Sequence, residues 1–356
     1  MTVSTTLPRN PEDITATWLS AALDVPVVET RVEPIGTGQT GATYRVTPTY
    51  GGQTDLPATL VVKLPSQDEA VRERVALGYR AEYAFYKEVA GTVSVPLPTV
   101  FHCEIDRDGA DFVLLMADLA PAVQGDQILG CNPELARLSV EALAGLHGPR
   151  WSDATWTEFT GATMPKPNRD FADGMGQIVR MATETSVSRL ADRLSAEDQE
   201  LLTKAASVIG EWLMLNPERF SLLHGDYRLD NLLFHPDGTV TVVDWQTLTI
   251  GLPARDLSYF LATSLLPESR AGSEKGLVAD YFRALSGHGV TGYTEAECWQ
   301  DYRLGMLQVP LLTTMGHAFS AVTDRGDEMA TIMLQRGCHA MRELDTLGLV
   351  RELSPA

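Results

Sequence analysis

The chain has 356 residues, of which 44% are hydrophobic and 21% are charged. These fractions are typical of globular domains and exclude a fibrous or largely disordered chain. The 28 Lys and Arg residues against 47 Asp and Glu residues give a net charge of −19, which argues against nucleic acid or an anionic membrane as a partner. No protein partner is indicated. Because we find neither an apolar leader nor an apolar run of spanning length, we expect a cytoplasmic protein.

The first third of the chain predicts a small antiparallel sheet. Short β-type runs alternate with glycine-rich turns, and one long helical pattern at 68–90 interrupts them. A shorter helical pattern at 11–24 precedes the first strand. The strands are expected at 27–35, 42–46, 59–64, 99–104 and 112–116.

The remainder of the chain is predicted to be mainly helical, with one β-hairpin at 231–244. We therefore expect an α+β fold with a sheet-rich N-lobe at 1–116, a hinge at 117–124 and a helical C-lobe at 125–356. The helices are expected at 132–147, 172–186, 196–215, 274–285, 295–321 and 327–347.

Three glycines between the first two strands match the pattern G-x-G-x-x-G: Gly36, Gly38 and Gly41. In a dinucleotide-binding fold this pattern opens a helix, whereas here the chain continues as a strand. A hairpin that covers phosphate groups is therefore favoured over a dinucleotide site. A glycine-rich turn without any ligand is the alternative, because the pattern alone is weak.

Lys63 ends an apolar strand about twenty residues after these glycines, where a kinase lysine would hold the α- and β-phosphates. A lysine beside a buried strand needs a counter-charge. Of the acids on the following helix, Glu82 is preferred because Ala81 and Phe85 place it on the core-facing side. A lysine that simply ends a strand at the surface is the alternative.

The strongest pattern is His224-Gly225-Asp226 with Asn231 five positions after Asp226, which is the spacing of a kinase catalytic loop. Phosphoryl transfer needs one carboxylate to accept the proton of the acceptor hydroxyl and an amide oxygen nearby to bind Mg²⁺. Asp244, after the next apolar run, supplies a second and anionic metal ligand. Asp256 is expected to cap a helix or to brace this loop.

These residues resemble the aminoglycoside phosphotransferase/choline kinase superfamily. The sequence HGDYRLDNLLF is similar to that of kinase-like domains related to those of some acyl-CoA dehydrogenases, and to that of the ecdysteroid-kinase-like group. The resemblance implies a bilobal protein-kinase-like fold that binds ATP and Mg²⁺ between the lobes. It implies that Asp226 is the catalytic base and that Asn231 and Asp244 bind Mg²⁺. The resemblance also implies that Lys63 binds phosphate and that the segment containing Met116, Asp118 and Leu119 contacts the adenine.

The acceptor is expected to be a small molecule with a hydroxyl group, since no activation segment of a protein kinase is present. Its identity does not follow from the shared motifs. An antibiotic kinase that confers resistance, acting on an aminoglycoside or a macrolide, is one alternative to a metabolic enzyme. A catalytically silent ATP-binding pseudokinase is another. Several Met and aromatic residues of the helical part are candidates for the acceptor pocket, although core packing is the favoured interpretation of them. They are Trp156, Met164, Met175, Met181, Tyr302, Met306 and His317.

Overall fold

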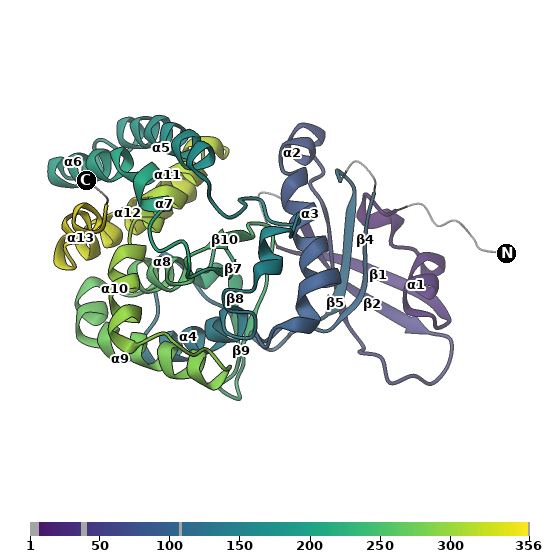
Figure 1. Cartoon of the computed structure of the whole chain (residues 1–356). Helices are drawn as coiled ribbons and strands as arrows, with labels where there is room; N and C mark the ends of the chain where they lie inside the picture. The colour runs from purple at the N-terminus through teal and green to yellow at the C-terminus, as the bar shows by residue number, and fades with distance from the viewer. Residues whose placement is uncertain (1–6, 37–40, 107–108, 355–356) are drawn as a thin grey trace.

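The computed structural model describes residues 7–36, 41–106 and 109–354. Its N-terminal part is built on a five-stranded antiparallel sheet, which confirms the predicted small sheet. The strand order is β1-β2-β3-β5-β4, which the sequence did not predict. Figure 1 shows this sheet at one end of the molecule and most helices at the other. The strands are β1 (Val27–Gly36), β2 (Gly41–Tyr50), β3 (Leu60–Pro65), β4 (Val100–Ile105) and β5 (Phe112–Ala117).

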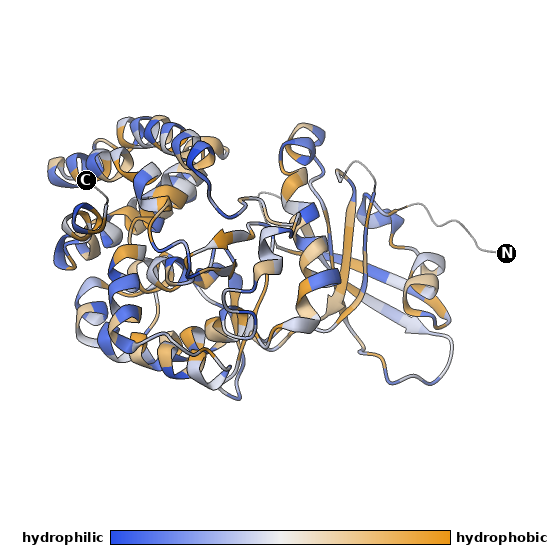
Figure 2. Cartoon of the chain, viewed as in Figure 1, coloured by the Kyte–Doolittle hydropathy of each residue, from blue (hydrophilic) through white to orange (hydrophobic). Residues whose placement is uncertain are grey.

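The two faces of the sheet bury different side chains because residues alternate along each strand. Leu60, Val62 and Leu64 of β3 pack with α1 (Ala16–Leu23) in one apolar cluster. The opposite face packs against α3 (Ala76–Ala84). Both faces of β5 are therefore covered, which fits its nearly unbroken apolar sequence and its strongly hydrophobic colour in Figure 2.

The helical segment predicted at 68–90 is divided. α2 (Glu69–Arg74) ends at Val75, whose φ of −100° and ψ of 7° lie outside the helical range, and α3 follows directly. A π-helical turn at Phe85–Val89 then replaces the last α-helical turn. Hydrophobic periodicity persists across such breaks, so the sequence pattern alone predicted one continuous helix.

The C-terminal part contains helices packed around one large apolar cluster. Three predicted long helices are broken: the segment 196–215 at Val208, 295–321 at 306–307, and 327–347 at 344–345. The helices are α4 (Pro133–His147), α5 (Arg169–Arg189), α6 (Ala196–Ser207), α7 (Ile209–Leu213), α8 (Ala254–Ser264), α9 (Pro267–Gly287), α10 (Glu295–Gly305), α11 (Gln308–Phe319), α12 (Asp324–Glu343) and α13 (Thr346–Leu353).

The sequence analysis expected a helix after Asp256 as one alternative but gave it no bounds; the structure has α8 there, and α8 begins before Asp256. Every residue from Ala254 to Ser264 is buried, including polar residues such as Arg255 and Asp256, so the polar positions of this helix do not mark a solvent-exposed face. Within the described residues no helix is long and apolar enough to cross a membrane.

Five short strands lie between the sheet and the helices (Figure 1). The sequence predicted only the hairpin of β8 and β9, which is marked by a turn with Pro236, Asp237 and Gly238; all five strands have two or three residues, too few to show alternation by themselves. One small sheet has the order β6-β8-β9 and the other pairs β10 with β7. The strands are β6 (Val123–Gln124), β7 (Ser221–Leu223), β8 (Leu232–Phe234), β9 (Val240–Val242) and β10 (Thr249–Gly251).

Candidate active site

The loop that carries the strongest sequence pattern, residues 224–231, connects β7 to β8. Its turn depends on Gly225, which has a φ of +82° and lies so close to the Thr247 carbonyl that a Cβ atom would come within 1.8 Å of that oxygen. Only glycine combines this conformation with this contact. The loop is therefore pressed against the segment after β9.

Asp256 braces the same loop from α8. Its carboxylate is fully buried and accepts hydrogen bonds from the backbone N–H groups of His224 at 2.7 Å and Gly225 at 3.2 Å. Because it lies inside α8, it does not cap that helix; of the two roles considered, bracing is the one that the structure shows. His224 is also buried, and its Nε2 lies 3.1 Å from the Val243 carbonyl, so its ring links the loop to β9.

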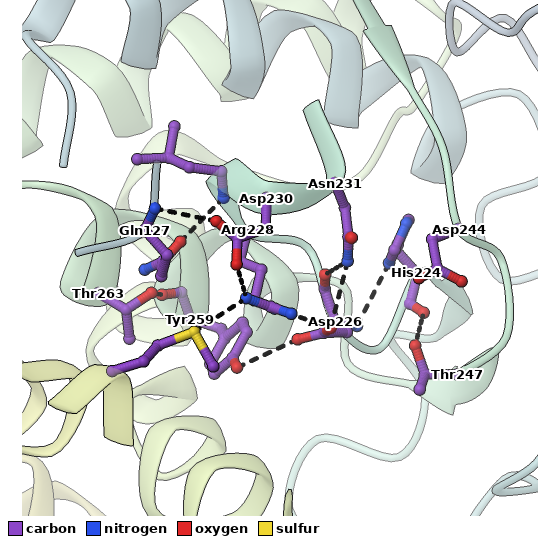
Figure 3. A network of polar contacts seen from close by, with 12 residues as sticks. Gln127, His224, Asp226, Arg228, Asp230, Asn231, Asp244, Thr247, Tyr259 and Thr263 are labelled. Atoms are coloured by element: carbon purple, nitrogen blue, oxygen red, sulfur yellow. Dashed lines mark hydrogen bonds and ion pairs between the residues drawn. The ribbon is translucent and has the colours of Figure 1, made fainter. Parts of the chain in front are cut away.

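The carboxylate of Asp226 lies at the centre of the polar network in Figure 3. Its Oδ2 atom accepts from Arg228 Nε at 2.9 Å and from Asn231 Nδ2 at 3.2 Å. Its Oδ1 atom accepts from the Tyr259 phenol at 3.2 Å. The Asp226 side chain is 27% exposed, so these bonds orient a carboxylate that a substrate can still reach.

Asn231 and Asp244 are brought together by the backbone. The amide nitrogen of Asn231 donates to the Asp226 carbonyl at 2.8 Å, and the Asn231 carbonyl accepts from Val243 N–H at 3.0 Å. Among the described residues, no group donates to the Asn231 side-chain oxygen. That oxygen is therefore available to a ligand.

Lys63 joins the sheet to the segment after β9. Its Nζ lies 2.7 Å from Glu82 Oε2 and 2.9 Å from Asp244 Oδ1, and Glu82 is the partner that the sequence analysis preferred. Gln246 also donates to Glu82, at 3.0 Å. Asp244 has a φ of +68°, a conformation that is uncommon for a residue with a side chain and that is found at functional sites.

Burial and charge act in opposite directions on these three groups. Burial disfavours the Lys63 ammonium, but Asp244 and Glu82 outweigh it and raise the pKa of Lys63. Burial pushes the pKa of Asp244 upward, yet the Lys63 charge overcomes it and the pKa lies below its ordinary value. For Glu82, burial outweighs the attraction of Lys63, and its pKa is raised. We therefore expect the Lys63–Asp244 pair to be charged at neutral pH.

The donor atoms fit Mg²⁺. This cation prefers a few carboxylate or amide oxygens and takes its other ligands from phosphate and water. The side-chain oxygen of Asn231 and the carboxylate of Asp244, whose side chain is 38% exposed, are hard donors of this kind. No group of three or more His, Cys, Asp or Glu side chains able to hold a metal occurs in the part of the chain that the structure describes, so a zinc-type cage is not formed there.

Of the remaining predicted residues, the structure places Gly41 beside the lysine. Gly36 ends β1 and Gly41 begins β2, and a Cβ on Gly41 would come within 3.7 Å of Lys63 Cε, so this strand end lies directly beside the lysine. Gly38 lies outside the described residues. Met116 is in the apolar cluster beside α3.

Asp118 is already paired, since its carboxylate accepts from Arg45 Nε at 2.6 Å and from Arg45 Nη2 at 3.3 Å. Leu119 follows, and its carbonyl accepts from Ala122 N–H. The side chain of Asp118 therefore supports the segment and is not free to contact a ligand.

Most of the Met and aromatic residues considered for the acceptor pocket lie in the hydrophobic core. Trp156, Met175, Tyr302 and Met306 are buried in the large cluster, whereas Met181 is 58% exposed. Met164 lines a small cavity of about 10 Å³ together with Phe171, Leu213 and Leu311 among others. His317 is buried and bonds to Ser186 and Asp327. The favoured interpretation of packing is confirmed for the buried residues.

Sequence reasoning missed the roles of Arg228 and Tyr259. Arg228 lies in the loop itself, two residues from Asp226 and two from Asp230, and bonds to both. Its position between two acids was a usable signal. Tyr259 lies on α8, 33 residues after Asp226, and nothing in the local pattern pointed to their contact.

Short stretches of the chain are similar to curated proteins. Acyl-CoA dehydrogenase family member 11 of Homo sapiens is 44% identical over 62 residues, which cover 16% of this chain and 8% of that protein. Acyl-CoA dehydrogenase family member 10 of Mus musculus is 42% identical over 64 residues, covering 17% and 6%. The matched stretches thus span less than a tenth of the length of these relatives.

Solved structures resemble the whole chain. A putative aminoglycoside phosphotransferase from Ralstonia eutropha has a TM-score of 0.57 and 18% identity, covering 92% of this chain and 97% of that one. A microcompartment-associated aminopropanol kinase has a TM-score of 0.56 and 18% identity, covering 94% and 98%. These likenesses confirm the predicted fold class.

The match to a family model is broader than that to any of these curated relatives. The phosphotransferase enzyme family, APH, matches residues 31–297, from β1 into α10. This range includes the glycine pattern, Lys63, the loop 224–231 and Asp244. The chain therefore belongs to the APH phosphotransferase enzyme family, and it is a phosphotransferase.

Proposed function

We propose that the protein transfers the γ-phosphoryl group of ATP, with Mg²⁺, to a hydroxyl group of a small molecule. One observation carries this proposal: Lys63 from the sheet contacts Asp244, and Asn231 contacts Asp226 while its carbonyl binds the residue before Asp244. A phosphate-binding cation, two metal ligands and a proton acceptor thereby share one site.

Each side chain has a proposed task in the reaction. Asp226 accepts the acceptor's hydroxyl proton as the new oxygen–phosphorus bond forms and the bond to the ADP oxygen breaks. Asn231 and Asp244 hold Mg²⁺, and Lys63 neutralises phosphate charge. When bound, Mg²⁺ supplies further neutralisation of the phosphate oxygens. The network around Asp226 holds the carboxylate in place before substrate arrives, which lowers the cost of orienting it during the reaction.

The nucleotide is proposed to lie between a sheet-rich N-lobe, 1–116, and a helical C-lobe, 125–356, joined by the hinge 117–124. Gly36, Gly38 and Gly41 cover its phosphates, with Glu82 fixing Lys63. The backbone of 116–119, which contains Met116, Asp118 and Leu119, meets the adenine. The pairing of Asp118 with Arg45 supports this use of the backbone, because it stiffens the segment without placing a carboxylate against the base.

Asp226→Asn tests the proposal most simply. Purified protein is incubated with ATP, Mg²⁺ and a panel of hydroxyl compounds, and ADP release is followed with a coupled assay. The panel contains amino alcohols, sterols, hydroxyacyl compounds, aminoglycosides and macrolides. We expect acceptor-dependent ADP release that the variant loses by a factor of at least 100, while Asp237→Asn, in an exposed turn, retains it.

The panel also separates the acceptor classes. The relatives named as acyl-CoA dehydrogenase family members favour a metabolic acceptor. ADP release only with aminoglycosides or macrolides, together with protection of a sensitive host, would instead assign a resistance enzyme. Tight binding of ATP and Mg²⁺ without ADP release for any acceptor would assign a silent nucleotide-binding protein.

A further inference from the structure

The two carboxylate oxygens of Asp226 differ in how many donors they already bind. Oδ2 accepts two hydrogen bonds, from Arg228 and Asn231. Oδ1 accepts one, from Tyr259, among the residues that the structure describes. A carboxylate oxygen offers about two acceptor positions. Oδ2 is therefore saturated, and Oδ1 retains one position for a further donor.

The saturation of Oδ2 is held in place by a second set of contacts. Arg228 Nη1 lies 2.5 Å from Asp230 Oδ2 and 3.3 Å from Met329 Sδ on α12. Asp230 in turn accepts from the backbone N–H of Gln127 at 3.0 Å. Burial disfavours the Arg228 charge, but Asp226 and Asp230 outweigh it and raise its pKa. The guanidinium is thus charged, anchored at both ends and unable to turn away from Oδ2 without breaking the contact to Asp230.

We propose that the acceptor hydroxyl docks on Oδ1 of Asp226 and that Tyr259 is the positioning residue that presents this oxygen. The inference rests on the proposed function, which makes Asp226 the proton acceptor. Figure 3 shows Tyr259 and Asp244 on opposite sides of Asp226. On this assignment the acceptor hydroxyl would meet Asp226 at the oxygen that Tyr259 contacts, while Asp244, the proposed metal ligand, lies on the other side.

Two properties of the α8 side support this assignment. Burial raises the pKa of Tyr259 well above its ordinary value, so its phenol remains a hydrogen-bond donor across the neutral range. Thr313 of α11 is 7% exposed, and its side chain interacts with the same phenol. The Tyr259 phenol therefore has a polar neighbour on α11 in addition to Asp226.

The docking side is tested by a crystal structure with ADP, Mg²⁺ and aluminium fluoride, where an apical water oxygen stands in for the acceptor hydroxyl. We expect this oxygen about 3 Å from Oδ1 of Asp226, within hydrogen-bond distance. An apical oxygen bound to Oδ2, with Oδ1 bonded only to Tyr259, would overturn the inference and leave the proposed function standing. If neither ADP nor the fluoride bound between the lobes, the proposed function itself would fail.

The positioning role is tested with Tyr259→Phe, using water as the acceptor and ADP release from ATP as the readout. We expect kcat to fall about tenfold at an unchanged KM for ATP. Tyr302→Phe is the matched control, as this buried phenol also donates to a carboxylate, Glu274 at 2.7 Å, away from the site.

The outcomes of this comparison are distinct. A kcat of Tyr259→Phe equal to that of Tyr302→Phe refutes the positioning role. A wild-type rate that Asp226→Asn leaves unchanged refutes the proposed base, and with it the inference.

Discussion

Replacing Lys63 by methionine should destabilise the protein by about 3 kcal/mol, mainly through Glu82. At 2.7 Å and an effective dielectric of 20, the attraction between the two charges is roughly 6 kcal/mol before desolvation is subtracted. The contact with Asp244 counts for less, because that side chain is 38% exposed and screened by water. Removing one member of a buried pair typically costs about 3–5 kcal/mol, since the other charge stays buried.

A second substitution separates this effect from lost packing. Lys63→Met leaves a carboxylate with 1% side-chain exposure unpaired, whereas Lys63→Met/Glu82→Gln leaves a neutral amide that can still bond to Gln246. The double variant should therefore regain about 2 kcal/mol relative to the single one. The deficit of Lys63→Met should also shrink as pH falls, because burial already raises the pKa of Glu82 and the folded state takes up its proton more readily.

The free energy of unfolding is measured by urea denaturation at pH 7.5, followed by tryptophan fluorescence. Lys204→Met is the control, because Lys204 pairs with Glu200 at the surface with side chains 55% and 67% exposed, and a change below about 0.5 kcal/mol is expected. The reasoning is refuted if Lys63→Met lies within about 1 kcal/mol of wild type, or if adding Glu82→Gln destabilises it further.

Two further predictions concern the glycine turn at Gly225 and the carboxylate of Asp244. Gly225→Ala should lower the free energy of unfolding in urea by about 3 kcal/mol or more, and Gly238→Ala by only about 1 kcal/mol. Both glycines have φ near +80°, but only a Cβ at position 225 would clash with the Thr247 carbonyl. Equal losses would show that this clash does not contribute. Because the pKa of Asp244 is lowered, its contribution to stability is complete above the ordinary value of 3.8 and is lost as pH falls below that value. Asp244→Asn should therefore be less stable than wild type at pH 6, and the difference should be much smaller at pH 3. A pH-independent difference would contradict this prediction.

Much of the site was predictable because its chemistry is concentrated in short, fixed spacings. The interval from Asp226 to Asn231 and the acid after the next strand pointed to residues that the fold brings together. The choice of Glu82 followed from helix periodicity, which survives the break at Val75 since α3 itself is regular.

What the sequence did not reveal has physical reasons as well. Helix α8 is buried on all sides, polar residues included, and the contact of Tyr259 with Asp226 in the loop 224–231 depends on tertiary packing. The breaks within the later helices fall where the hydrophobic pattern runs on without interruption. Strands of two or three residues, such as β6 and β7, are defined by their partners and not by their own sequence.

The most direct test of the central claim compares ADP release by wild type and Asp226→Asn with ATP, Mg²⁺ and the acceptor panel, while nucleotide binding is measured separately with a fluorescent ATP analogue. We predict that Asp226→Asn binds nucleotide within about threefold of the wild-type affinity and loses turnover by at least 100-fold. The variant keeps the size of the side chain but cannot accept the proton. Turnover at the wild-type rate with intact binding would contradict the assignment of Asp226 as the base.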